Sequence, residues 1–303
     1  MRKALPVVAA GILALSSAVF AHEPADEVYN AVKFPPGLAP TIDADCSDWD
    51  AVPGDQYWIF TDSLFPLGDF HLTEGLGRGE NDASSFQTTY RVGWSEETNN
   101  LYYCNSVYDD VHTIDRPGDF DWYEDDSNEY FFNIRHLSKD EVKALSDENF
   151  GTYLGFNYAV PQSAAGPLWM IIGICVGCEW IEKDTELHTL EWGYEGDMYG
   201  ESTYTYEHRV APFDGRPLDV DGSPEVLEYQ TLQDGQIVHI TFATNDDDAL
   251  HESGRGGAWS TGDCCSPSND WFLEPHNPNI AWPDAPTSVD EQSWGRIKAQ
   301  YLN

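Results

Sequence analysis

The chain has 303 residues, with 53 Asp and Glu against 15 Lys and Arg, so its formal net charge is −38. So few basic groups exclude nucleic-acid binding and argue against binding to an anionic membrane surface. Apolar residues make up 41% of the chain and aromatic residues 14%, unlike disordered acidic sequences. We therefore expect a folded protein with a sizeable core.

The first residues have the pattern of an export signal. Arg2 and Lys3 precede an apolar stretch over 4–19, and Val19-Phe20-Ala21 supplies the small residues of a cleavage site. This pattern predicts a Sec-type signal peptide over residues 1–21 and a secreted or periplasmic protein. A membrane anchor is the alternative, but the stretch is short for a bilayer span and no later segment reaches that length.

Residues 22–40 contain four prolines and are expected to form an extended lead-in. Residues 41–303 are expected to form a single domain with an insertion around 62–85, because no later stretch clearly marks a boundary. Within this domain, short runs rich in β-branched and aromatic residues alternate with turn residues, which predicts strands. The runs cover 56–61, 86–94, 100–107, 129–135, 152–160, 168–175, 203–210 and 294–302.

Two local signals add a hairpin and a helix. The runs 226–232 and 236–243 flank Gln233-Asp234-Gly235, and Asp-Gly suits a tight hairpin turn. Ser138-Lys139-Asp140-Glu141 is a capping box and predicts one short helix. Many short strands with one short helix predict an all-β fold, an antiparallel β-sandwich of the jelly-roll or immunoglobulin-like kind with long loops.

Six cysteines in an exported chain indicate disulfides. Cys46 lies near the start of the domain and Cys104 lies on a strongly β-like run, so these two could staple the first strands together. The pairings of the other four stay open, within or between the two pairs Cys175 and Cys178, and Cys264 and Cys265. A redox or zinc role for the first of these pairs is the alternative to a structural one.

Three patterns, in order along the chain, resemble the signatures of family-nine carbohydrate-binding modules and their DOMON-like relatives. Residues 41–49 (TIDADCSDW) resemble the opening motif, residues 92–110 a strand, turn and strand ending in "V-x-D-D", and residues 123–131 (YEDDSNEYF) a later segment. Residues 206–212 and 294–297 agree more loosely. The resemblance implies a β-sandwich that grips a sugar between two aromatic side chains, with structural calcium nearby.

The resemblance also implies particular sugar-binding residues. Tyr123 falls where the family has a platform Trp, its neighbour Trp122 is the other candidate, and Glu129 falls on a Glu that binds hydroxyls. Asn157 matches a family Asn, but Gly155 replaces an Arg, so the sugar specificity need not be that of the family. The second platform is expected before the final strand, where the candidates are Trp259, Trp271 with the nearby Asn269, and Trp282.

Elementary chemistry points in the same direction, because sugar rings present apolar faces to flat aromatic groups and hydroxyls to carboxylates and amides. The chain has 11 Trp, 16 Tyr and 14 Phe, although most aromatic residues of any protein belong to its core. Acidic residues over 115–126 are candidate ligands for Ca²⁺, which takes about six to eight oxygen ligands. They are Asp115, Asp119, Asp121, Asp125 and Asp126, with a solvated loop as the alternative and Asp43, Asp45 and Asp48 as a second, weaker group.

Together these features favour a secreted, non-catalytic carbohydrate-binding protein that supports polysaccharide degradation or uptake. Its expected ligands are mono- or oligosaccharides or polysaccharide ends, its expected partners include glycoside hydrolases, and Ca²⁺ is the one expected cofactor, with no haem or nucleotide. A glycoside hydrolase is the first alternative, although no particular carboxylate pair stands out. A haem-binding DOMON-like electron carrier, with Met170 or Met198 as axial ligand, and a structural surface protein are the others.

Overall fold

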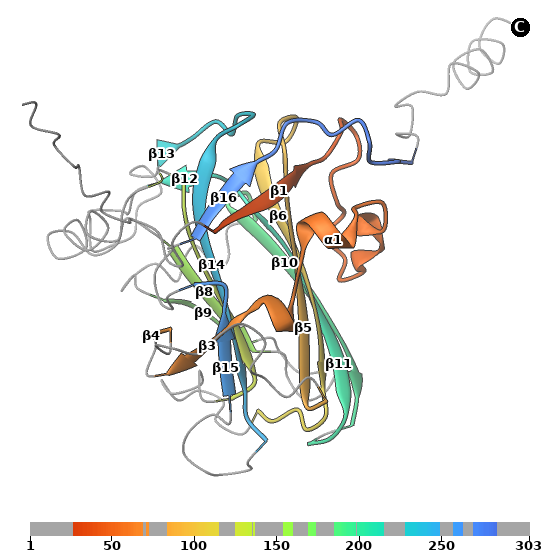
Figure 1. Ribbon diagram of the computed structural model, residues 1–303, viewed down its shortest axis with the longest axis vertical. Helices are drawn as coiled ribbons and strands as arrows, with labels where there is room; N and C mark the ends of the chain where they lie inside the picture. Colours follow the sequence, from red (N-terminus) through yellow and green to blue (C-terminus); the bar gives the residue numbers. More distant parts are fainter. Residues whose placement is uncertain are drawn as a thin grey trace, which may run out of the picture.

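Two β-sheets face each other in the computed structural model of the chain (Figure 1). Nearly all strand pairs within them are antiparallel, so the expected all-β sandwich is confirmed. Strands β4, β8 and β9 are described by their backbone alone. The structure describes residues 27–68, 71–72, 84–114, 125–134, 136, 154–159, 169–173, 185–197, 199–214, 228–248, 257–262 and 269–283.

The first layer, called sheet B here, has the strand order β10-β11-β6-β5, with β2 pairing a part of β5. Side chains of β5 alternate between the interior and the outer side, which is the period of two that a half-buried strand requires. β5 and β6 lie where the sequence predicts strands, whereas β10 has no predicted counterpart. The strands are β2 (Trp58–Phe60), β5 (Phe86–Ser95), β6 (Asn100–Asp109), β10 (His188–Gly196) and β11 (Ser202–Val210).

The second layer, called sheet A, is built around the long strand β14 (Ile237–Asp246). On one edge, β14 pairs with β16 and then with β15, and on the other it pairs with β7, which continues into β8 and β9. The other strands are β3 (Phe65–Gly68), β4 (His71–Leu72), β7 (Ser127–Asn133), β8 (Leu154–Ala159), β9 (Trp169–Gly173), β15 (Gly257–Ser260) and β16 (Asn269–Leu273).

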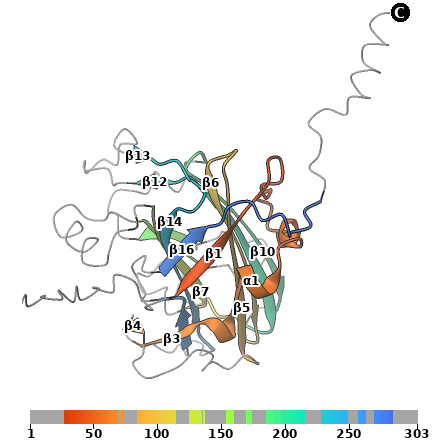
Figure 2. The same ribbon diagram turned by 45° about the horizontal axis from the view of Figure 1, so that its top comes forward.

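Strand β1 (Val28–Lys33) belongs to both layers. Its first half runs parallel to β16 and its second half runs parallel to β5, and it crosses obliquely between the layers in both ribbon views (Figures 1 and 2). Ala31 and Val32 are fully buried at this junction. The expected extended lead-in over 22–40 therefore contributes a structural strand, which ends before Pro35 and Pro36.

The expected hairpin around Asp234 is wrong in its pairing, although its turn is present. Gly235 has a φ of 79° and the turn closes through the Gln236 amide, which donates to the Gln233 carbonyl. The amide of Leu273 donates to the Gln236 carbonyl, so β16 takes the place beside β14 that the predicted partner strand would occupy. Residues 228–229 instead form β13 (Glu228–Tyr229), which pairs with β12 (Phe213–Asp214).

The core between the sheets is rich in aromatic side chains. Tyr90 of β5 stacks on Phe242 of β14 with ring centroids 4.6 Å apart, and Tyr103 of β6 contacts Tyr130 of β7 at 5.0 Å. Such contacts join the two sheets directly. The described part of the chain holds no helix with the length and apolarity needed to cross a bilayer. Its helices are the single turns η1 (Cys46–Trp49), α1 (Gly54–Tyr57) and η2 (Thr61–Ser63), while the predicted helix after Ser138 and the strand over 294–302 lie outside the described residues.

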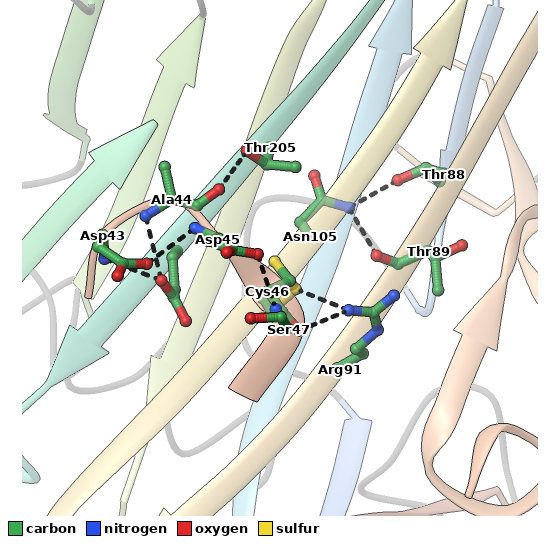
Figure 3. Close-up of a disulfide and its surroundings, with 12 residues drawn as sticks. Asp43, Ala44, Asp45, Cys46, Ser47, Thr88, Thr89, Arg91, Asn105 and Thr205 are labelled. Atoms are coloured by element: carbon green, nitrogen blue, oxygen red, sulfur yellow. Dashed lines mark hydrogen bonds between the residues drawn. A yellow bond between two sulfur atoms is a disulfide. The ribbon is translucent and has the colours of Figure 1, made fainter. Parts of the chain in front are cut away.

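The disulfide between Cys46 and Cys104 is formed as expected, with the two Cα atoms 5.9 Å apart. It fastens the opening motif to the outer side of sheet B, where Arg91 of β5 donates to the Cys46 carbonyl at 3.4 Å (Figure 3). A second apolar cluster, which includes Phe34, Trp49 and Tyr102, fills the space under this segment. The other four cysteines lie outside the described residues.

The carboxylates of the opening motif hold its turns. Asp43 accepts from the Asp45 amide at 3.0 Å, Asp45 accepts from the Ser47 amide at 3.1 Å, and Asp48 accepts from the Thr41 amide at 2.8 Å. In the part of the chain that the structure describes, no convergent group of metal-ligand side chains includes them. These three residues therefore stabilise the loop locally, and the structure does not gather them into the second cation site considered above.

Candidate functional site

The side of sheet A that faces away from sheet B, called the outer face of sheet A here, carries a row of buried polar groups. Tyr130 and Phe132 of β7, and Ile240 and Phe242 of β14, belong to the core between the sheets. Because neighbouring residues of a strand point to opposite sides, the residues between them lie on the outer face. On β7 these are Ser127, Glu129, Phe131 and Asn133, and on β14 they are His239, Thr241, Ala243 and Asn245.

Glu129 occupies the centre of this face. The strand register places it directly opposite Asn157 of β8 and Ala243 of β14. Nδ2 of Asn245 donates to Oε1 of Glu129 at 3.0 Å and to the Ser127 hydroxyl at 3.0 Å, and Glu129 is only 3% exposed. A carboxylate can accept hydrogen bonds from hydroxyl groups, and such charge-assisted hydrogen bonds are among the stronger ones.

The three candidates for the second aromatic platform, Trp259, Trp271 and Trp282, lie away from Glu129. Trp271 is fully buried in the core, stacks on Tyr29 at 5.0 Å and donates from Nε1 to the Ile240 carbonyl. Trp259 also belongs to the core and stacks on Phe86. Trp282 packs against Phe34 in the apolar cluster beyond sheet B, on the opposite side of the molecule from the outer face of sheet A.

The remaining sugar-site candidates have different outcomes. Asn269 is 1% exposed and donates to the Thr261 carbonyl at 2.8 Å, so it holds the backbone beside β16. Trp122 and Tyr123 lie outside the described residues. Among the residues that the structure describes, the strand register therefore places two candidates, Glu129 and Asn157, opposite each other on neighbouring strands.

A second group of functional type lies at one end of the sandwich. It is called the acidic cluster here and consists of Asp109 at the end of β6, His112, Asp126 before β7, and Asp246, Asp247 and Asp248 at the end of β14. All but Asp248 are buried. Nδ1 of His112 lies 3.3 Å from Oδ2 of Asp126 and 3.5 Å from Oδ2 of Asp109. Ligand atoms of Asp109, Asp246 and Asp248 also lie within 4.8 Å of one another.

Burial and neighbouring charges raise the pKa values of carboxyl groups in the acidic cluster. Burial raises the pKa of Asp126 well above its ordinary value, with a further rise from Asp109, while His112 opposes the shift. Burial and the neighbouring charge of Asp109 raise the pKa of Asp246 to about 8. Close carboxylates in a buried site repel each other, and a divalent cation removes this repulsion.

The donor set of the acidic cluster fits Ca²⁺. Calcium binds hard oxygen ligands at about 2.3–2.6 Å, so carboxylate oxygens that lie within 4.8 Å of one another can share one ion. Asp126, an expected ligand, is part of the cluster, and Asp125 is fully buried beside it. The expected ligands Asp115, Asp119 and Asp121 lie outside the described residues.

The other members of the acidic cluster were missed from the sequence. Asp109 and the run Asp246-Asp247-Asp248 each follow a correctly predicted strand, which was a usable signal. What the sequence does not show is that the ends of β6 and β14 lie at the same end of the sandwich. The cluster therefore depends on the packing of two sheets.

Comparison with known proteins gives matches among solved structures. No family model matches the sequence, and no curated protein matches it. Among solved structures, the chain is similar to a family-nine carbohydrate-binding module from Caldicellulosiruptor kristjanssonii in complex with cellotriose, with 15% identity and a TM-score of 0.46. The same module in complex with glucose gives 16% identity and a TM-score of 0.44, and both matches cover 84% of this chain and 98% of the module. The similarity is one of fold.

Proposed function

We propose that the protein is an exported, non-catalytic carbohydrate-binding protein with its sugar site on the outer face of sheet A. The observation that supports this most directly is the register of β7 and β8, which sets Glu129 opposite Asn157. These two residues come from separate parts of the sequence, and the resemblance to family-nine modules matches Glu129 to a hydroxyl-binding Glu and Asn157 to a family Asn. Asn245, on the next strand, adds an amide that already donates to Glu129.

Tyr123 completes the proposed site as its aromatic platform. It precedes Glu129 by a few residues, which is the relative position that the resemblance implies. An aromatic ring covers the apolar face of a sugar while the carboxylate and amides bind its hydroxyls. The proposed role is to hold mono- or oligosaccharides, or polysaccharide ends, in support of glycoside hydrolases that degrade them.

In this proposal, Ca²⁺ binds in the acidic cluster through Asp109, Asp246 and Asp248, whose ligand atoms lie within 4.8 Å of one another. When bound, the ion neutralises these carboxylates and fixes the end of β14 against the end of β6, next to His112 and Asp126. Asp126 lies three residues before Glu129, and Asn245 immediately precedes Asp246, so the cluster steadies the strands that carry the sugar site. The residues themselves supply this link through the Asp247 amide, which donates to Oδ1 of Asp126 at 2.6 Å.

Calorimetric titration with glucose, xylose, galactose and their oligosaccharides tests the sugar site. The variant Glu129→Gln keeps the shape of the side chain and an acceptor for Asn245 but removes the charge, so we expect affinity to fall about 10- to 100-fold. Tyr123→Ala should abolish binding while the fold stays intact. Glu191→Gln, an exposed residue of β10, is the matched control and should bind like the parent protein. Unchanged affinity in Glu129→Gln would place the site elsewhere, and new reducing ends during incubation would reveal a hydrolase.

A further inference from the structure

Three side chains of metal-binding type converge at a place that neither the sugar site nor the acidic cluster uses. They are His239 of β14, Asp270 of β16 and His136, which follows β7. The register pairs His239 with Asp270 on one side and with Asn133 of β7 on the other. Residues from three neighbouring strand segments of sheet A, far apart in the sequence, are thereby brought to one point.

The ligand atoms of these three side chains all lie within 4.8 Å of one another. Nε2 of His239 lies 2.9 Å from Oδ1 of Asp270, and Nε2 of His136 lies 3.3 Å from the same oxygen. The two imidazole rings meet edge to face with centroids 4.6 Å apart. A tetrahedral zinc ion with ligands at about 2.0–2.1 Å separates those ligands by roughly 3.3 Å, so little movement would let all three atoms share one ion.

Two of the three residues are held on strands inside sheet A, and the third is accessible to solvent. The His239 side chain is completely buried and the Asp270 side chain is 11% exposed, and both stand on strands in the interior of sheet A. The His136 side chain is 38% exposed, so the group is open to solvent on this side. The group is also separate from Glu129, because His239 lies four residues along β14 from Ala243, a distance of about 13 Å.

We propose that His136, His239 and Asp270 form a binding site for Zn²⁺. Two imidazoles with one carboxylate are the donors that zinc prefers, whereas Ca²⁺ prefers oxygen ligands alone. Three protein ligands leave the fourth tetrahedral position for water or an external ligand. The competing interpretation is a hydrogen-bonded His-Asp-His group without metal, and the experiment separates the two.

Zinc binding to the tag-free full chain tests the site, measured by competition with a chromophoric chelator and by metal content after dialysis. We expect one tightly bound zinc ion that excess Ca²⁺ does not displace. His136→Asn removes an imidazole at a residue whose φ is 52°, a backbone conformation that Asn tolerates well. Asp270→Asn removes the charge and keeps the shape. Each variant should weaken zinc binding at least about tenfold, since even second-shell partners of metal ligands contribute 10- to 100-fold.

Two control variants test whether a loss of zinc affinity is specific to the proposed site. His276→Gln changes an exposed histidine elsewhere, and Glu191→Gln changes an exposed carboxylate of β10, and both should retain the zinc affinity of the parent protein. The visible spectrum of the Co²⁺-substituted protein should show tetrahedral bands that His136→Asn alters. Absence of tight zinc binding, or equal affinity in His136→Asn and the parent protein, would overturn the proposal and leave a hydrogen-bonded group. Neither result depends on the sugar titrations.

Discussion

Glu207 of β11 is a buried carboxylate that ties the opening motif to sheet B. It accepts hydrogen bonds from the amides of Asp43 at 3.0 Å and Ala44 at 3.2 Å, and it is fully buried. Burial raises its pKa from the ordinary 4.5 to about 7, while the Asp43 amide opposes the shift. The folded protein therefore holds a proton at pH values where the unfolded chain has lost it.

This shift predicts a pH-dependent contribution to stability. Because the folded-state pKa lies above the unfolded one, the free energy of unfolding should fall as the pH rises from 4.5 to about 7. Glu207→Gln keeps an acceptor for the two amides and cannot ionise. We expect it to match the parent protein near the low end of this range and to exceed it by about 3 kcal/mol above pH 7.

Urea unfolding at several pH values measures this difference. Glu191→Gln serves again as the exposed control and should follow the parent protein throughout the range. If the difference between Glu207→Gln and the parent protein did not change with pH, the carboxyl would be ionised in the folded state and the assigned shift would be wrong.

At the scale of elements, β1 and β5 approach each other so closely that only glycine fits at position 93. A Cβ atom there would lie 2.3 Å from Cε2 of Phe34 and 2.9 Å from the Val32 carbonyl oxygen. Gly93→Ala should therefore lower the free energy of unfolding by about 1–3 kcal/mol, the usual range for overpacking. Gly54→Ala, where the nearest atoms are at 3.4 Å, is the control and should change little in the same urea experiment.

The Cys46–Cys104 disulfide attaches the opening motif to β6 across a sequence separation of 58 residues. Replacing both cysteines by serine should cost about 2–4 kcal/mol, because the unfolded chain regains the freedom of a long loop. Sugar affinity should stay unchanged, since the disulfide and Glu129 lie on opposite outer sides of the sandwich. Chemical unfolding combined with calorimetric titration checks both statements, and a loss of sugar binding would contradict the proposed location of the site.

The long central strands could be predicted from sequence because they carry their own signal. The runs at 86–94, 100–107 and 203–210 alternate or are strongly β-forming, and they became β5, β6 and β11. β16 is short and was not predicted, and without its register the side to which Trp271 points could not be known. The resemblance pointed to Glu129 and Asn157 as sugar-binding residues, whereas the acidic cluster and the proposed zinc site depend on strand pairing that no local pattern shows.

At the scale of the whole molecule, a net charge of −38 makes cations the natural stabilising ligands. If Ca²⁺ binds specifically to the acidic cluster, millimolar Ca²⁺ should raise the melting temperature, and a chelator should reverse the rise. At a Ca²⁺ concentration a hundredfold above Kd, the free energy of unfolding should increase by about 2.7 kcal/mol. Asp246→Asn should reduce the effect. Mg²⁺ at the same concentration is the control, because it screens charge equally well but dehydrates reluctantly. An equal rise with Mg²⁺ would indicate screening alone.

Because β1 pairs with strands of both sheets, the sandwich can be completed only after both partner strands have been synthesised. Val28 pairs with Asp270, more than two hundred residues further along the chain. As the polypeptide emerges from its amino end, sheet B can assemble early, but the seam with sheet A must wait for one of the last described strands. A nascent chain that stalls before Asn269 would leave the edge of β1 bare and open to intermolecular strand pairing. A chain truncated before β16 is thus expected to aggregate, and not to fold into a smaller stable domain.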